Sequence, residues 1–211
     1  MDLFELRQEY ANQQHDLEST SSDPFEQFQS WFKDASNAKL LEPNAMVLGT
    51  TNGVGMPALR IVLLKSLTPE GFTFFSNYNS RKAKHLESNN QATLLFPWHE
   101  MQRQVEVQGT IEKTSREESE SYFSKRPRGS QLGAWVSDQS SEISSRQELE
   151  DSWQEFEAKF GDQPVPTPEH WGGYRLKPNR FEFWQGGSKR LHDRVIYEMQ
   201  QGSWTRSLLA P

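Results

Sequence analysis

The sequence predicts a single α+β domain built on an antiparallel β-barrel. From about residue 45 to 113, short strand-like segments follow one another with turn residues between them. Segments with aromatic residues at helical spacing lie before and after this region. A final set of strands ends the chain, so the β structure is divided around helices. Adjacent short strands joined by tight turns favour an antiparallel sheet or barrel.

The first helix is expected after an N-terminal arm, residues 1–22, which we interpret as a loosely attached helix and a polar linker, "ESTSSDP". Asp23 offers an N-cap, and Pro24 takes the first helical position. Four aromatic residues then share one face of the helix: Phe25, Phe28, Trp31 and Phe32. This helix should therefore cover apolar surface. Residues 23–211 are expected to form one domain.

Strands are predicted at "AMVLGTT", "ALRIVLLK", "GFTFFSN", "ATLLFPW" and "RQVEVQGTIEK", with one short helix among them at "SRKAKHLESN". Two further helices should begin at capping boxes, Ser115 with Glu118 and Ser145 with Glu148. The second of these should stop at Gly161. Four last strands are predicted at "GGYRL", "RFEFWQ", "DRVIYEM" and "SWTRSLL".

The composition excludes several classes of function. The 211 residues include no cysteine, which excludes disulfide scaffolds, thiol catalysis and thiolate metal sites. No apolar run reaches the ~18–20 residues of a membrane span, and the N-terminus is acidic where a signal peptide is basic. We therefore expect a cytoplasmic protein without a membrane partner. A formal net charge of −6 argues against a nucleic-acid partner.

Positive residues nevertheless occur in clumps. They are Arg60 and Lys65; Arg81, Lys82 and Lys84; Lys125, Arg126 and Arg128; and Lys189, Arg190 and Arg194. Local basic clusters in an acidic protein suit small anionic ligands, and solvated surface charge is the alternative.

The segment "NYNSRKAKHL" indicates one anion site. Ser80 is a candidate N-cap, which puts Arg81, Lys82 and Lys84 in the first helical turn. The helix dipole disfavours cations there by ~0.3–1 kcal/mol each. A phosphate bound by the helix N-terminus, Arg81 and Lys82 would reverse this penalty. A tolerated pair of surface charges is the other interpretation.

The segment "YFSKRPRGSQ" indicates a second phosphate site. Arg126 and Arg128 flank Pro127, which stiffens the backbone, and Ser130 and Gln131 add a hydroxyl and an amide. A basic loop beside a helix start explains the same residues equally well.

Templates for other chemistry are not met. The five histidines lack metal-ligand spacing, so no metal site is predicted. Ser130 lacks the Gly-x-Ser-x-Gly elbow of hydrolases. The run "GTTNGVG" precedes a strand rather than a helix, unlike nucleotide-binding loops.

Six segments and the terminal "LAP" carry a resemblance that spans nearly the whole chain beyond the arm. They are "RIVLLK" (60–65), "FFSNYNSRKAKHLESN" (74–89), "LLFPWHEMQRQVEVQG" (94–109), "YFSKRPRGSQLGAWVSDQSS" (122–141), "HWGGYRL" (170–176) and "FEFWQGGSKRLHDR" (181–194), and the combination of "RPRGSQLGAW" with "FWQGGSKRLHDR" is the specific feature. Together they resemble the pyridoxamine 5′-phosphate oxidases of vitamin B6 metabolism. Other flavin split barrels would not be expected to carry these motifs together. The resemblance implies an FMN-binding split β-barrel with flanking helices, a homodimer with FMN in a cleft between subunits.

The resemblance also implies which residues bind the cofactor and the substrate. FMN would be held by Arg60, Ile61, Val62, Leu63, Leu64, Lys65, Phe75, Ser76, Arg81, Lys82, Gln104, Gln139, Ser140, Trp184 and Arg194. For Trp184 a packing role is as plausible as flavin contact. The substrate phosphate would be bound by Lys65, Tyr122, Arg126 and Ser130. Catalytic Arg190 and His192 would approach the substrate ring and C4′, and Arg7 and Tyr10 match a segment that can close over the site.

The implied reaction is hydride transfer from C4′ of pyridoxamine or pyridoxine 5′-phosphate to N5 of FMN, giving pyridoxal 5′-phosphate, with O2 reduced to H2O2. The protein would orient the substrate against the flavin and compensate negative charge. Whether Arg190 or His192 is an obligatory base is left open. Two alternatives remain: a split-barrel flavin reductase with another substrate, and a non-catalytic flavin or B6 carrier.

The chain departs from the family pattern at its end. The family usually ends Arg-Leu-x-Pro, whereas the corresponding residues here are Leu208, Leu209, Ala210 and Pro211. The segment after Tyr10 also lacks an arginine-rich run. An accessory phosphate site that used these arginines would be missing or rebuilt.

Overall fold

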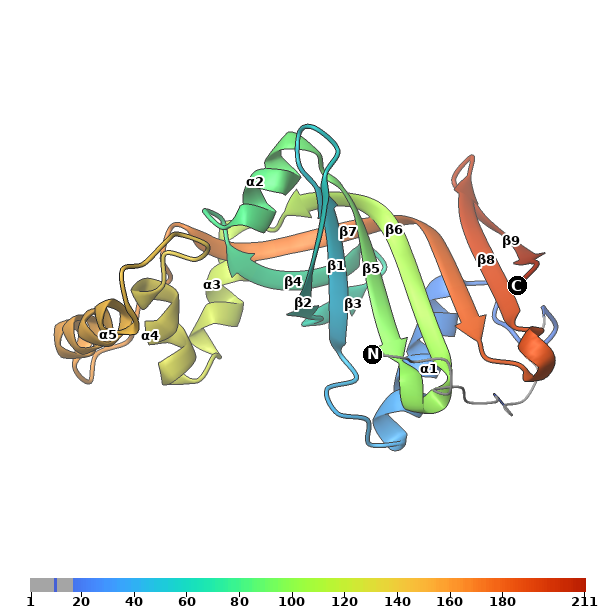
Figure 1. Cartoon of the computed structure of the whole chain (residues 1–211), viewed down its shortest axis with the longest axis horizontal. Coiled ribbons are helices and arrows are strands. Elements are labelled where there is room, and N and C mark those ends of the chain that lie inside the picture. Colours follow the sequence, from blue (N-terminus) through green and yellow to red (C-terminus); the bar gives the residue numbers. More distant parts are fainter. Residues whose placement is uncertain (1–9, 11–16) are drawn as a thin grey trace, which may run out of the picture.

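The computed structural model describes residue 10 and residues 17–211, and over these residues it forms one curled antiparallel sheet with helices at its sides (Figure 1). The sheet order is β2 (Pro57–Leu63), β1 (Ala45–Thr51), β5 (Gln91–Trp98), β6 (Arg103–Lys113), β7 (Trp171–Gln185), β4 (Gly71–Asn77) and β3 (Ser66–Thr68). β8 (Asp193–Gln200) pairs with β7, and β9 (Ser203–Leu209) pairs with β8. The Lys65 N–H, just after β2, donates to the Thr73 carbonyl of β4 at 2.9 Å. This hydrogen bond connects the first strand of the order with its last strands, so the sheet curls towards a closed barrel. The predicted antiparallel barrel is confirmed as a split barrel.

The inside of the curled sheet is packed with aromatic side chains. Phe72, Phe96 and Phe181 are completely buried, and they contact residues of α1 (Pro24–Asn37). Fully burying one such side chain is worth ~1.5–3 kcal/mol. α1 begins as predicted, because Asp23 Oδ1 accepts the Phe25 N–H at 2.8 Å. The amphipathic pattern of α1 and its N-cap therefore determine which helix packs against the aromatic interior of the sheet.

Three helices lie at one end of the molecule, opposite β8 and β9 (Figure 1). They are α3 (Arg116–Ser124), α4 (Arg128–Val136) and α5 (Arg146–Phe160), and a second buried cluster of Phe123, Leu132, Val165 and Trp171 packs beneath them. α2 (Arg81–Ser88) lies beside β1, and two short 3-10 turns complete the elements, η1 (His99–Met101) and η2 (Ser188–Arg190). Within the described ranges no helix is both long and apolar enough to cross a membrane.

Two local predictions were wrong, and one helix, α4, was not predicted. It begins directly after Pro127, in agreement with the interpretation of a basic loop beside a helix start, because proline at the cap pre-sets the backbone and lacks only an N–H that a helix start leaves unbonded. The segments "GGYRL" and "RFEFWQ" are one strand, β7, since Pro178 lies at an irregularity opposite Gly109 and does not end the pairing. At α5 the hydroxyl and N–H of Ser144, not the hydroxyl of Ser145, bond to Glu148.

Most of the predicted N-terminal arm lies outside the described residues. Its last part is tied to the C-terminal strands, because the Tyr197 hydroxyl donates to the Ser21 carbonyl at 2.6 Å and Arg206 donates to the Thr20 hydroxyl at 2.8 Å. The domain boundary after residue 22 stays a prediction.

Candidate active site

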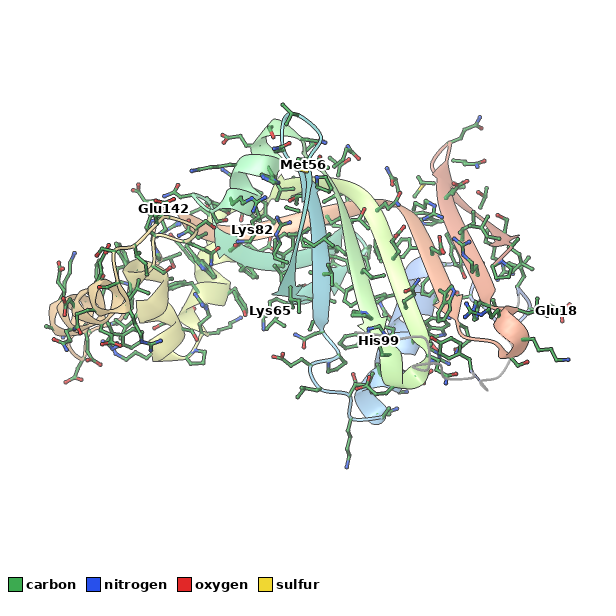
Figure 2. All side chains as sticks on the ribbon, viewed as in Figure 1. Glu18, Met56, Lys65, Lys82, His99 and Glu142 are labelled. Carbon is green, nitrogen blue, oxygen red and sulfur yellow. The ribbon has the colours of Figure 1, made fainter. Side chains whose placement is uncertain are left out.

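A cavity of about 610 Å³ lies between the sheet and the helices α3 and α4. Figure 2 shows Lys65 and Lys82 on the side of the sheet that faces these helices. Eleven predicted site residues line the cavity: Ile61, Val62, Leu63, Lys65, Phe75, Ser76, Lys82, Tyr122, Arg126, Ser130 and Gln139. They come from β2, β4, α2, α3, α4 and the loops that follow β2, α3 and α4, so the fold brings together residues that are far apart in the sequence.

The cavity is positively charged. Lys65, Lys82, Lys125 and Arg126 line it, and no aspartate or glutamate is among the described residues of its wall. In a partly enclosed site, charges of one sign are weakly screened and attract a counter-charge. The cavity is therefore suited to an anionic ligand, although the whole chain is acidic.

Arg126 gives the most specific indication of such a ligand. Its Nη1 atom is buried and has no hydrogen-bond partner in the structure. Its guanidinium lies 4.7 Å from the centre of the Trp171 ring, which holds it by a cation–π contact. Burial lowers the pKa of Arg126. Because buried donors are nearly always paired, this one indicates an acceptor supplied by a ligand.

One wall of the cavity is a stack of aromatic rings. The rings of Phe75 and Tyr122 lie 4.0 Å apart at 16°, and those of Phe75 and Trp171 lie 5.4 Å apart at 10°. Stacking fixes the plane of the Tyr122 ring, which lines the same cavity as Arg126 and Ser130.

The start of α2 forms a second cationic group. The Ser80 hydroxyl donates to the Asn77 carbonyl and does not cap the helix, and the first turn contains no acidic residue. Lys82 Nζ donates to Gln139 Oε1 at 2.6 Å. Burial, and then the positive charge of Arg60, lower the pKa of Lys82 to about 8. The uncapped helix start with these cations fits a phosphate.

Arg60 is held by β1, because its Nη1 donates to the Leu48 carbonyl at 2.9 Å and to the Thr50 hydroxyl at 2.7 Å. Burial and Arg81 lower the pKa of Arg60. Arg81 itself is exposed at the helix start.

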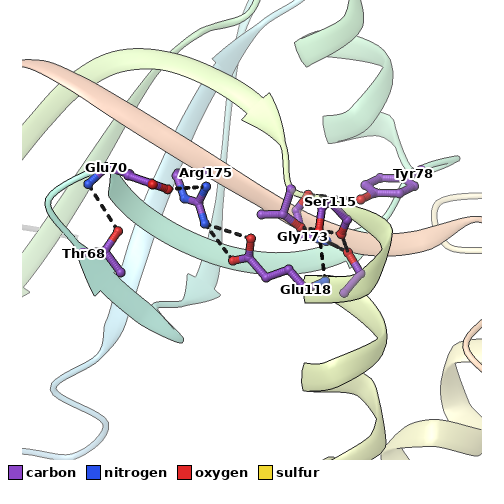
Figure 3. A network of polar contacts seen from close by, with 9 residues as sticks. Thr68, Glu70, Tyr78, Ser115, Glu118, Gly173 and Arg175 are labelled. Carbon is purple, nitrogen blue, oxygen red and sulfur yellow. Dashed lines mark hydrogen bonds and ion pairs between the residues drawn. The ribbon is translucent and has the colours of Figure 1, made fainter.

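A polar network holds α3 against the sheet (Figure 3). Arg175 of β7 pairs with Glu70 at 2.8 Å and with both carboxylate oxygens of Glu118 at 2.8 and 2.9 Å. The Ser115 hydroxyl accepts the Glu118 N–H at 3.1 Å, which confirms this half of the predicted capping box. Since α3 carries Tyr122, the network sets the position of this wall of the cavity.

A second group of predicted site residues lies elsewhere. Gln104, Trp184 and Arg194 are direct neighbours across β6, β7 and β8. The Trp184 and His192 rings are 4.8 Å apart, and the Tyr10 ring meets both edge-on at 5.8 and 5.6 Å.

The loop that carries the catalytic candidates has a specific geometry. The Gly187 N–H donates to His192 Nδ1 at 3.1 Å, so the proton of the neutral imidazole is on Nε2. A Cβ on Gly187 would lie 2.1 Å from the Leu191 carbonyl oxygen, so the loop requires glycine. Lys189 and Arg190 adopt the left-handed backbone conformation, with φ of 54° and 61°. Two such non-glycine residues in succession store strain of ~1–2 kcal/mol each.

The cavity residues and the group around Gln104, Trp184 and Arg194 are not brought together within one protomer. Trp171 at the start of β7 lines the cavity, whereas Trp184, near the end of the same strand, belongs to the group around Gln104 and Arg194. Thirteen residue steps along a strand span up to about 43 Å. Gln104, Trp184 and Arg194 accordingly do not line the cavity of the same chain.

The remaining predicted residues are placed as follows. Leu64 is buried in the core, and Ser140 is exposed beside Gln139 with a φ of 78°. Arg7 lies outside the described residues. Sequence reasoning missed Lys125 and Trp171 as cavity residues, although both stand in quoted motifs next to predicted ones.

Comparisons with known proteins agree with this geometry. The family model for pyridoxamine 5′-phosphate oxidase matches residues 32–160, and the model for the pyridoxine 5′-phosphate oxidase C-terminal dimerisation region matches residues 171–211. A pyridoxine/pyridoxamine 5′-phosphate oxidase of Aliarcobacter butzleri is 50% identical over the full length of both chains. One from Rubrobacter xylanophilus is 50% identical over 100% of this chain and 97% of its own.

Solved structures share the fold. PhzG from Burkholderia lata, in complex with tetrahydrophenazine-1-carboxylic acid, superposes with a TM-score of 0.87 at 28% identity, over 92% of this chain and 95% of its own. A related FMN binding protein from Nostoc punctiforme has a TM-score of 0.72 at 15% identity, over 91% of this chain and 100% of its own. The two family models together match most of the chain, and the full-length relatives share half of its residues; the chain belongs to the pyridoxamine 5′-phosphate oxidase family.

Proposed function

We propose that this protein is an oxidase that converts pyridoxamine 5′-phosphate and pyridoxine 5′-phosphate to pyridoxal 5′-phosphate, with a flavin cofactor that we take to be FMN. The amine substrate gives an imine, which water hydrolyses to the aldehyde and ammonia, and the alcohol gives the aldehyde directly. O2 is the final acceptor and leaves as H2O2.

The observation that carries this proposal is the unpartnered Nη1 of Arg126 in a cationic cavity. A substrate phosphate would accept from Arg126 and from the Tyr122 and Ser130 hydroxyls, with Lys65 as a further cation. Arginine forms bidentate bonds to phosphate, and Tyr122 is already oriented by its aromatic stack.

The second cationic group fits the phosphate of FMN. Arg60, Arg81, Lys82 and the uncapped start of α2 are chemically suited to hold it. Ser76 and Gln139 line the cavity beside Lys82, Ser140 follows Gln139, and Ile61, Val62, Leu63 and Lys65 would lie along the flavin. When bound, FMN accepts the hydride from substrate C4′ and passes the electrons to O2.

We propose further that each active site is shared between two subunits. Gln104, Trp184 and Arg194 would reach the flavin bound in the cavity of the partner subunit, because they are remote from the cavity of their own chain. The match of residues 171–211 to a dimerisation region supports this arrangement. Residues 23–211 would then act as one FMN-binding domain that includes the dimerisation segment.

His192 and Arg190 would contact the substrate ring. Since His192 Nδ1 accepts the Gly187 N–H, Nε2 carries the proton, and His192 would act as a hydrogen-bond donor to the substrate rather than as a base. Arg190 is exposed on a strained turn, from which its side chain can reach a ligand bound in the cavity of the partner subunit. Arg7 and Tyr10 would close over the bound substrate, and Tyr10 already lies against Trp184 and His192.

An absorbance spectrum before and after anaerobic addition of pyridoxamine 5′-phosphate tests this proposal. We expect a flavin spectrum that bleaches with substrate, recovers in air and leaves pyridoxal 5′-phosphate. Bound flavin that never bleaches would favour another substrate or a carrier. A protein that binds no FMN would refute the proposal altogether.

A further inference from the structure

Arg194 is held by a carboxylate, Glu182, that stands in a quoted motif but is not among the predicted site residues. Glu182 of β7 is only 9% exposed, and its Oε1 accepts from Arg194 Nε at 2.8 Å and pairs with Arg194 Nη2 at 2.7 Å. The third nitrogen, Nη1, donates to the Ala210 carbonyl at 2.9 Å. Each nitrogen of this planar group thus has a fixed partner, which leaves the guanidinium one orientation.

Glu182 is itself anchored. Its Oε2 pairs with Arg180 Nη2 at 2.8 Å, and Arg180 Nη1 pairs with Glu106 at 3.1 Å. Burial alone raises the pKa of Glu182, but hydrogen bonds and charge from Arg180 and Arg194 outweigh it and hold the pKa below its usual value. The carboxylate is therefore ionised at neutral pH and holds Arg194 with charge-assisted bonds.

The location of this pair gives it a function. Arg194 lies directly across from Trp184, which in turn lies across from Gln104. A long arginine side chain beside Trp184 would otherwise sample many rotamers. The conformational entropy lost when the ligand orders such a side chain would weaken ligand binding. Glu182 removes this freedom before the ligand arrives.

We propose that Glu182 is a positioning residue for the flavin site, which acts by fixing the guanidinium of Arg194. This inference rests on the proposed function, because Arg194 is a flavin contact only if the protein binds FMN between its subunits. Glu182 itself touches no ligand in this account.

The chain supplies a matched control in Glu106. Glu106 lies directly opposite Glu182 on β6 and pairs with the other side of Arg180. Its carboxylate bonds to Arg180 and Gln108 rather than to Arg194. Substitution of either glutamate by glutamine removes one negative charge from the same network, but only Glu182→Gln acts on Arg194.

The experiment is a titration of the full-length apoprotein with FMN, in which the quenching of flavin fluorescence reports binding. We expect Glu182→Gln to raise the Kd about tenfold, by analogy with the ~10–100-fold loss of affinity when the supporting contact of a metal ligand is removed. Glu106→Gln should change the Kd by less than about twofold. Glu182→Asp keeps the charge but shortens the reach, and it should weaken FMN binding as well.

A double-mutant cycle separates positioning from a merely structural role. If Glu182 acts through Arg194, Glu182→Gln should have no further effect on the Kd in an Arg194→Gln background. The inference fails if the loss persists in that background, if Glu106→Gln causes an equal loss, or if both Glu182 variants bind FMN like the wild type. Wild-type protein that binds no FMN would instead refute the proposed function. Thermal unfolding and the dimer mass of each apoprotein report folding; if Glu182→Gln does not fold, the cycle is run with Glu182→Asp.

Discussion

Affinity for FMN should fall as the pH rises through the pKa of Lys82. Burial and the charge of Arg60 lower this pKa to about 8 in the ligand-free site. The proposed FMN phosphate would lie at the start of α2 beside Lys82, and a dianion there restores the charged form. Binding then requires a proton at Lys82 wherever the apoprotein has lost it.

The magnitude follows from that pKa. With a value of about 8, roughly 90% of Lys82 is charged at pH 7 and roughly 10% at pH 9. If the bound state requires the charged form, the Kd rises about tenfold over this range, which equals about 1.4 kcal/mol. Lys82 is partly exposed, so solvent screening lowers this limit, and we expect about three- to tenfold. The phosphate, with a second pKa near 6, stays a dianion throughout and adds no slope.

The assay is a fluorescence titration of apoprotein with FMN at intervals from pH 7 to 9. Lys82→Met should bind FMN more weakly at pH 7 and show little pH dependence. Lys84→Met is the matched control, because it removes a cation from the same helix turn at an exposed position outside the cavity, and it should keep the wild-type slope. A flat wild-type profile, or an unchanged slope in Lys82→Met, would refute the reasoning.

Three further predictions concern the substrate side. Arg126→Gln should lower kcat/KM for pyridoxamine 5′-phosphate by ~10–100-fold, since a hydrogen bond to a charged group is worth ~1.5–3 kcal/mol. The Kd for FMN should stay within about twofold of the wild-type value, and a parallel loss of flavin binding would contradict the assignment of Arg126 to the substrate phosphate. His192→Gln keeps an N–H donor near the place of Nε2 and should retain more activity than His192→Asn, whereas equal losses would argue against a donor role. Gly187→Ala should lower kcat/KM at least about tenfold because the new Cβ meets the Leu191 carbonyl, with the Tm of the apoprotein as the control; normal turnover would show that the loop adapts.

Local chemistry made much of the fold readable in advance. The cap at Asp23, the aromatic face of α1 and the glycine stop after α5 depend on residues close in sequence, and the structure confirms each. The same holds for the cationic first turn of α2, which has no acidic residue in the structure either. Predictions failed where two local signals competed, as at Pro178, which lies within one continuous strand rather than between two strands.

The site was only partly accessible to such reasoning. The motifs named residues that do meet in one cavity, among them Lys65, Tyr122 and Arg126, and their roles stay predictions. Nothing in the order of residues indicated that Gln104 and Arg194 would lie at the other end of a long strand.

The sequence by itself determined the helix caps, the strand alternation, the absence of thiol chemistry and the basic motifs, because each depends on residue type and short spacing. The tertiary structure alone decided that the Nη1 atom of Arg126 is buried and unpaired while its guanidinium lies over Trp171, that Lys82 is partly dehydrated next to Arg60, and that Glu182 holds Arg194. These properties arise from burial and from contacts between distant segments. Neither burial nor such contacts can be read from composition, because the same charged residue is inert in water and strongly interacting where water is excluded.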